Sequence, residues 1–122
     1  MADSEQKLQE AISLKVEGNY DAAIPILLEI VEAEQHNVEA RRQLGLIYGF
    51  QGLFDESLEE LAVAYGLDSS RADILCDLAM THAMLGMFEE AKVEFLRVLD
   101  MDPGNKTATQ QMVYFGDMAP AS

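Results

Sequence analysis

The chain has 122 residues, of which 22 are acidic and 8 are basic, giving a formal net charge of −14 at pH 7. This negative charge repels a phosphate backbone, so nucleic acid is excluded as the expected partner. Cys76 is the single cysteine, so no disulfide can form within the chain. Segment 1–7 lacks the features of a signal peptide, and no apolar stretch approaches the roughly 20 residues of a membrane-spanning helix. We therefore expect a cytoplasmic protein without a membrane span.

Three segments of nearly the same pattern recur at a period of 34 residues, and each begins with a glycine: Gly18, Gly52 and Gly86. An aromatic residue follows two positions later (Tyr20, Phe54, Phe88), and a small residue three positions after that (Ala23, Ser57, Ala91). A repeat of this length is typical of a supersecondary unit that buries its apolar face only by stacking on copies of itself.

Apolar spacing predicts helices over 4–17, 20–33, 38–51, 54–67, 72–85, 88–101 and 106–117. The first six form three units of helix, glycine turn and helix, at about 4–37, 38–71 and 72–105, and the glycines suit a helix end that needs a positive φ. We expect one all-α domain over 1–122 with a frayed tail at 118–122, and a bend at Pro25 within the second helix.

A small residue on the first helix of each unit is predicted to let the paired helices come into close contact. The first helices carry Ala11, Gly45 and Ala79 there, and the second helices bury the pairs Leu27 and Ile30, Leu61 and Ala64, and Phe95 and Val98. Met112 and Phe115, three residues apart on the seventh helix, are expected to cover the apolar side of the sixth, which stacked arrays need for solubility.

This set of positions resembles the tetratricopeptide repeat. The resemblance implies a right-handed α-solenoid of three helix-turn-helix repeats with a seventh, capping helix at about 106–117, and a concave groove lined by the first helix of each pair. The chain departs from the family pattern at its final proline, which is present as Pro103 but replaced by Gln35 and Ser69 in the earlier units.

A second stripe on each first helix corresponds to the groove lining of the family. Its predicted peptide-binding residues are Leu8, Ile12, Val16, Arg42, Gln43, Leu46, Phe50, Cys76, Asp77, Met80 and Met84. Most are apolar where packing between repeats does not require it, and a soluble protein rarely exposes such a patch without a use. The alternatives are that the tail folds back onto this surface or that a second copy of the chain covers it.

An acidic ladder of Glu5, Glu39 and Asp73 occupies one repeat position near the start of each first helix. A carboxylate there offsets the helix dipole by about 0.3–1 kcal/mol, and this interpretation is favoured over a grip on basic side chains of a ligand, although both can hold. The net charge likewise fits either simple solubility, which is favoured, or attraction to a basic partner.

One functional subclass of the family is predicted to be excluded. Its members hold the C-terminal carboxylates of heat-shock chaperones with lysine, asparagine and arginine at five groove positions. Those positions carry Leu8, Ile12, Gln43, Asp73 and Asp77 in this chain. Two carboxylates where cations are needed would repel an acidic terminus, so we expect no such binding.

No catalytic, cofactor or metal site is expected. Cys76 and His82 are six residues apart and point to different sides of one helix, His36 has no partner of its kind, and no phosphate-binding glycine loop occurs. His82 is expected to fill a slot between helices, and Cys76 to be a small groove or core residue.

The predicted function is a protein-interaction module, adaptor or small chaperone that binds an apolar peptide segment, which can also be basic. The alternative is a self-assembling homo-oligomer whose groove receives another copy.

Overall fold

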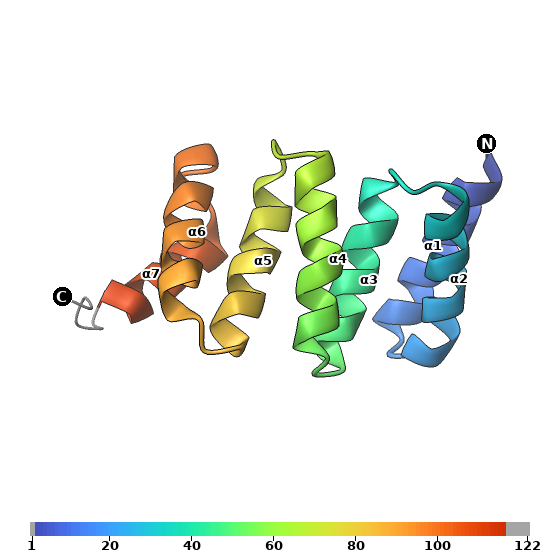
Figure 1. Ribbon diagram of the computed structural model, residues 1–122, viewed down its shortest axis with the longest axis horizontal. Coiled ribbons are helices and arrows are strands. Elements are labelled where there is room, and N and C mark those ends of the chain that lie inside the picture. The colour runs from blue at the N-terminus through green and yellow to red at the C-terminus, as the bar shows by residue number, and fades with distance from the viewer. Residues whose placement is uncertain (1, 117–122) are drawn as a thin grey trace. The chain divides into compact units, whose positions relative to one another are not determined.

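The computed structural model describes residues 2–116, and every regular element within them is an α-helix (Figure 1). In chain order these are α1 (Ala2–Val16), α2 (Tyr20–Ala33), α3 (Val38–Phe50), α4 (Phe54–Leu67), α5 (Ala72–Met84), α6 (Phe88–Met101) and α7 (Lys106–Gly116). Each helix end lies within two residues of its predicted position. The tail predicted to fray, 118–122, lies outside the described residues.

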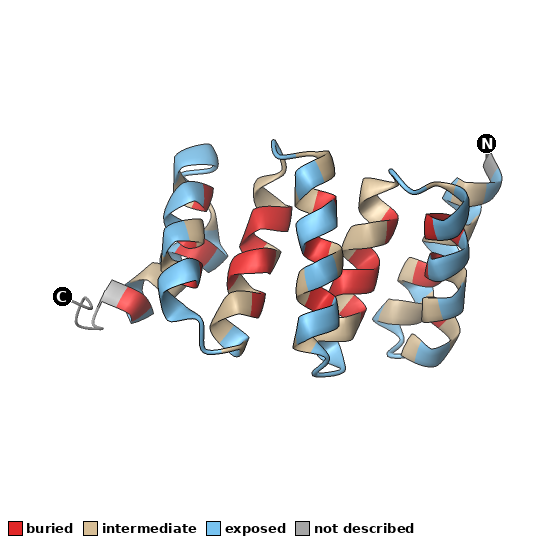
Figure 2. Ribbon diagram, in the orientation of Figure 1, coloured by how far each residue is buried: buried red, intermediate tan, exposed pale blue. Residues whose placement is uncertain are grey.

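The chain forms two compact units. The first contains α1 to α4, and the second contains α5 to α7. In the first, α1 packs on α2, α3 packs on α4, and α2 also packs on α3. In the second, α6 contacts both α5 and α7. Figure 2 shows exposed residues along α2 and α4 of the first unit and along α6 of the second.

The repeated glycines end the first helix of each pair, as predicted. Gly18, Gly52 and Gly86 have φ angles of 81°, 79° and 78°, which L-residues with a side chain rarely adopt. The next residue donates its backbone N–H to the carbonyl five residues earlier: Asn19 to Leu14, Leu53 to Tyr48, and Met87 to His82, each at 2.8 Å. This bond satisfies a carbonyl that the helix end leaves without a partner.

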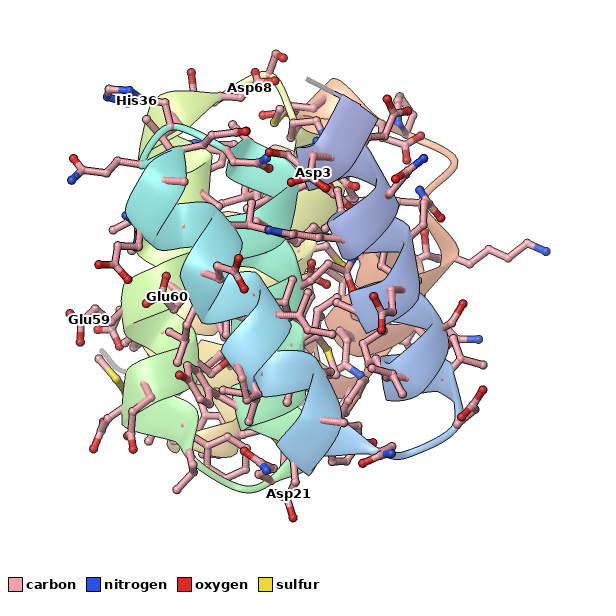
Figure 3. All side chains as sticks on the ribbon, turned by 90° about the vertical axis from the view of Figure 1, so that its right-hand side faces the viewer. Asp3, Asp21, His36, Glu59, Glu60 and Asp68 are labelled. Atoms are coloured by element: carbon pink, nitrogen blue, oxygen red, sulfur yellow. The ribbon has the colours of Figure 1, made fainter. Side chains whose placement is uncertain are left out.

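The core of the first unit is built from small and aliphatic residues, among them the predicted Ala11, Ala23, Leu27 and Ile30. Its buried members are Ala11, Ala23, Leu27, Ile30, Val31, Ala40, Leu44 and Ile47. Polar side chains tie α1 to α2 at the surface: Lys7 Nζ lies 2.6 Å from Glu29 Oε1, and Ser4 donates a hydrogen bond to Glu34. In Figure 3 the side chains of Asp21, His36 and Glu59 point away from the helices of this unit.

The core of the second unit extends from α5 through α6 to α7. Phe115 of α7 is buried, with its ring centroid 5.9 Å from that of Phe95 and 6.0 Å from that of Phe88. Ala108 of the same helix is also buried, and Met112 is half-buried. The prediction that α7 covers the apolar side of α6 is confirmed.

Pro25 lies inside α2, which continues on both sides of it from Tyr20 to Ala33. The residue is exposed, so the proline ring lies outside the buried core of the first unit. The bend expected at Pro25 stays a prediction.

Candidate functional site

An apolar surface on α1 and α3 remains open after the first unit has packed. We call Leu8, Ile12 and Val16 of α1, with Leu46 and Phe50 of α3, the first-unit apolar face. Within each helix these residues follow one another at intervals of four, so they share a side, and α1 contacts α3 directly. Val16 is 78% exposed and Phe50 is 61% exposed, while the other three are half-buried.

Phe50 is held in place by an aromatic contact that the sequence pattern did not reveal. Its ring stacks on that of Tyr20 at the start of α2, with centroids 6.0 Å apart and ring planes 29° apart. Tyr20 was predicted only as a repeated scaffold residue, but it also supports the edge of the first-unit apolar face. The largest side chain on this face is therefore exposed and yet restrained.

A polar network borders the same face and links α1 to α3. Lys15 Nζ donates to Gln43 Oε1 at 2.5 Å, and Gln43 Nε2 donates to Glu39 Oε1 at 3.1 Å. Arg42 Nη1 lies 3.5 Å from the same Glu39 oxygen. Gln43 is buried, so the structure places this predicted groove residue as a bridge between helices.

Lys15 was missed by the sequence analysis. The equivalent positions in the other units are Gly49 and Ala83, so no repeated signal marks this lysine. Only the spatial proximity of α1 and α3 shows that its ammonium group reaches Gln43.

The second unit carries a shorter apolar row on α5. Met80 is half-buried and Met84 is exposed, one helical turn further on. Asp77, on the same helix, is half-buried. Cys76 is buried, with its Sγ 3.9 Å from Asn105 Oδ1. Of the two roles left open for Cys76, the structure therefore favours a core position.

The acidic ladder lies at helix N-termini, as expected from the sequence. Glu5, Glu39 and Asp73 each fall in the first turn of α1, α3 and α5. Arg71 Nε and Nη2 donate to the Asp73 carboxylate at 2.9 and 2.8 Å. Glu39 accepts the Gln43 hydrogen bond, so at least two of the three acids contact polar groups of their own chain.

Burial and nearby carboxylates raise the pKa of one tyrosine of α3. Tyr48 of α3 is half-buried, and its pKa is raised chiefly because burial disfavours the phenolate. The negative charges of Glu60 and Glu56 raise the pKa of Tyr48 further. Glu60 also pairs with Arg41 across α3 and α4, at 3.1 Å.

The side chains of His82 and Cys76 have different neighbours. His82 Nδ1 lies 2.6 Å from Glu94 Oε1, so the imidazole fills the predicted slot between α5 and α6. The part of the chain that the structure describes holds no group of three or more His, Cys, Asp or Glu side chains arranged to bind a metal ion. Between residues 2 and 116, no helix has the length and apolarity needed to cross a membrane.

Residues 72–105 match the family model described as Tetratricopeptide repeat. No curated protein matches the chain.

Several solved structures share its fold. The first TPR of Spaghetti (RPAP3), bound to the HSP90 peptide SRMEEVD, has 21% identity and a TM-score of 0.88, over 93% of this chain and 90% of that one. The Arabidopsis OM64 TPR domain has 16% identity and a TM-score of 0.88, over 93% of each chain. YrrB, a TPR protein with an unusual peptide-binding site, has 24% identity and a TM-score of 0.83, over 90% of this chain and 57% of that one. At these identities the likeness shows the fold, and the predicted fold class is confirmed.

Proposed function

Because the chain is a tetratricopeptide repeat protein of three helix pairs and a seventh helix, we propose that it is a protein-interaction module that binds an apolar peptide segment of a partner protein. The proposed site is the first-unit apolar face. Met80 and Met84 form a separate, shorter apolar row on the second unit. Peptide binding by the Spaghetti domain and the peptide-binding site of YrrB support this class of function. No catalytic role is proposed.

The observation that carries the proposal is the exposure of Val16 and Phe50 beside Leu8, Ile12 and Leu46. Leaving side chains of this size in water forgoes about 1.5–3 kcal/mol each relative to full burial. A ligand that covers them recovers part of this free energy. Phe50 is also restrained by Tyr20, so less conformational entropy is lost when it is covered.

The charge of the site favours a ligand with basic side chains beside its apolar ones. Glu5 is exposed at the start of α1, and the chain carries a net charge of −14. Of the two cations bordering the face, Arg42 lies beside the Glu39 carboxylate, which offsets its attraction for an acidic peptide. Lys15 donates its hydrogen bond to the neutral amide of Gln43. Negative potential around an apolar face attracts a cationic segment and repels an anionic one.

The same chemistry disfavours capture of an acidic C-terminus. Leu8 and Ile12 offer no charged hydrogen bonds, and the Gln43 amide already bonds to Lys15 and Glu39. Asp73 accepts hydrogen bonds from Arg71. On the second unit, considered by itself, the carboxylates of Asp73 and Asp77 would repel a peptide that ends in several carboxylates.

Selection from a random peptide display library tests the proposal, because such a library samples acidic, basic and apolar peptides together. The wild-type protein should enrich peptides that combine large apolar residues with lysine or arginine. Phe50→Glu should lose these peptides, whereas the matched control Leu28→Glu, at an exposed leucine of α2, should retain them. Equal recovery by both variants would show that the face is not the site. Enrichment of acidic peptides would contradict the proposed preference for a basic ligand.

Phe50→Leu tests whether an apolar side chain at position 50 is enough for binding. It removes the stack on Tyr20 but keeps an apolar side chain at the position, so it should retain most of the selected peptides. If Phe50→Leu loses them as completely as Phe50→Glu while both variants stay folded, the apolar character of the face does not determine binding.

A further inference from the structure

The outer face of α7 exposes two large apolar side chains. α7 packs on α6 through Ala108 and Phe115, which are buried, whereas Val113 is 70% exposed and Tyr114 is 62% exposed. The apolar surface of this helix is therefore divided between a covered side and an open one.

The repeat register shows what the open side corresponds to. Val113 lies 34 residues after Ala79 and thus occupies the position of Ala11, Gly45 and Ala79. Those three are buried where the second helix of each pair packs closely. At Gly45 an added Cβ would lie only 2.6 Å from Leu61 Cγ. A valine is too large for so close a contact, so a helix that covers α7 must lie further away than a second helix of a repeat does.

The charge of α7 also differs from that around the exposed valines of α4 and α6. Residues 106–116 contain no acidic residue and a single charged one, Lys106, in a chain with 22 acidic residues. By contrast, exposed Val63 follows Glu59 and Glu60, and exposed Val93 lies beside Glu89, Glu90 and Glu94. Two copies of an anionic chain repel each other least where carboxylates are absent.

We propose that α7 docks against the α7 of a second copy of this chain, antiparallel about a twofold axis, with Val113 and Tyr114 buried between them. Such a contact is self-complementary. It brings together two acid-free faces and places the two helix dipoles antiparallel. The inference goes beyond peptide binding and uses residues outside the first-unit apolar face.

The size of the contact predicts its strength. A helix of 11 residues is about 16 Å long, so the pair buries less than the roughly 1,200 Å² of a stable interface. We therefore expect a reversible dimer that is half-formed at about 0.1–1 mM protein. Because both copies carry a charge of −14, added salt should strengthen the association by screening their repulsion.

Sedimentation equilibrium of the whole chain, from about 10 µM to about 1 mM, tests the proposal. The wild-type average mass should rise above the 13.5 kDa of one chain and rise further in added salt. Val113→Glu buries a charge in the contact and should weaken dimerisation by at least about tenfold. The matched control Val63→Glu makes the same substitution at an exposed valine of α4 and should leave dimerisation unchanged.

Three results would overturn the proposal. The first is a wild-type chain that stays monomeric throughout the concentration range. The second is equal weakening of dimerisation by Val113→Glu and Val63→Glu. The third is loss of the dimer in Phe50→Glu alone, which would place the second copy on the first-unit apolar face. Amide NMR spectra of the wild-type chain provide a test that needs no variant. Shifts that depend on protein concentration should be confined to α7, and their absence there would also contradict the proposal.

Discussion

The Ser57 hydroxyl donates a 2.7 Å hydrogen bond to the backbone carbonyl oxygen of Gly45, where α4 crosses α3. Both residues occupy positions where the repeat pattern calls for a small side chain, and Ser57 is buried. The bond therefore satisfies a buried hydroxyl and also marks a close approach of the two helices. The repeated small residues are a consequence of that approach.

Gly45→Ala should destabilise the first unit. An added Cβ would lie 2.6 and 2.8 Å from Leu61 side-chain atoms and 3.3 Å from the Ser57 carbonyl oxygen, and Leu61 is itself buried. Overpacking of about 1–3 kcal/mol exceeds the gain in helix propensity of about 1 kcal/mol. Urea denaturation should show a net loss of up to about 2 kcal/mol.

Gly66→Ala is the matched control for that experiment. Gly66 lies in α4, and an added Cβ there meets nothing within 4 Å. The substitution should stabilise the protein by up to about 1 kcal/mol. If both alanine variants shift the denaturation midpoint in the same direction, the close contact at Gly45 is not what limits residue size.

Phe115→Ala should detach α7 from the second unit. It removes a buried ring that contacts Phe88 and Phe95, and losing a core phenylalanine costs about 3–5 kcal/mol. Tyr114→Ala, at the neighbouring exposed position, should cost less than about 0.5 kcal/mol in dilute protein. Amide hydrogen exchange, which should accelerate throughout α7 in Phe115→Ala only, distinguishes the two.

Tyr48 should make stability fall at alkaline pH. Its pKa is raised in the folded protein by burial and then by Glu60 and Glu56, so the unfolded chain loses this phenol proton first. The stabilising contribution is complete below the pKa of an unfolded tyrosine, about 10, and is lost as the pH rises through the folded pKa. Tyr48→Phe should show a smaller loss of stability above pH 10 than the wild type, and parallel pH profiles would contradict this origin.

The peptide SRMEEVD, which is bound by the Spaghetti domain, should not bind this chain. Calorimetric titration up to about 1 mM peptide should show no saturable heat. Asp73→Lys with Asp77→Arg replaces two carboxylates by cations and should introduce weak binding. Micromolar binding by the wild-type chain would contradict the predicted absence of an acidic-terminus site.

The helices and their buried faces could be predicted from the sequence because three copies of one pattern average out local ambiguity. Gly18, Gly52 and Gly86 fixed the register, and one constraint, a positive φ at the helix end, explains all three. The open face of α7 was not predicted, since its significance depends on which side of the helix α6 covers.

The contacts bordering the candidate site could not be predicted in the same way because they do not repeat. The hydrogen bond from Lys15 to Gln43 and the stack of Phe50 on Tyr20 each join two helices through side chains without equivalents in every unit. Gln43 and Cys76 occupy positions on the predicted stripe and are nevertheless buried. Helical periodicity gives the direction of a side chain, whereas burial depends on what neighbouring helices place there.

NMR shift mapping with a peptide from the display selection tests the central claim most directly. Adding an apolar, basic peptide to the wild-type chain should shift resonances of Leu8, Ile12, Leu46 and Phe50 on α1 and α3, and should leave the outward residues of α2 and α4, such as Leu28 and Val63, unchanged. Saturable shifts centred on the first-unit apolar face are the predicted result. Saturable binding that shifts α2 and α4 and leaves α1 and α3 unchanged would contradict the proposal.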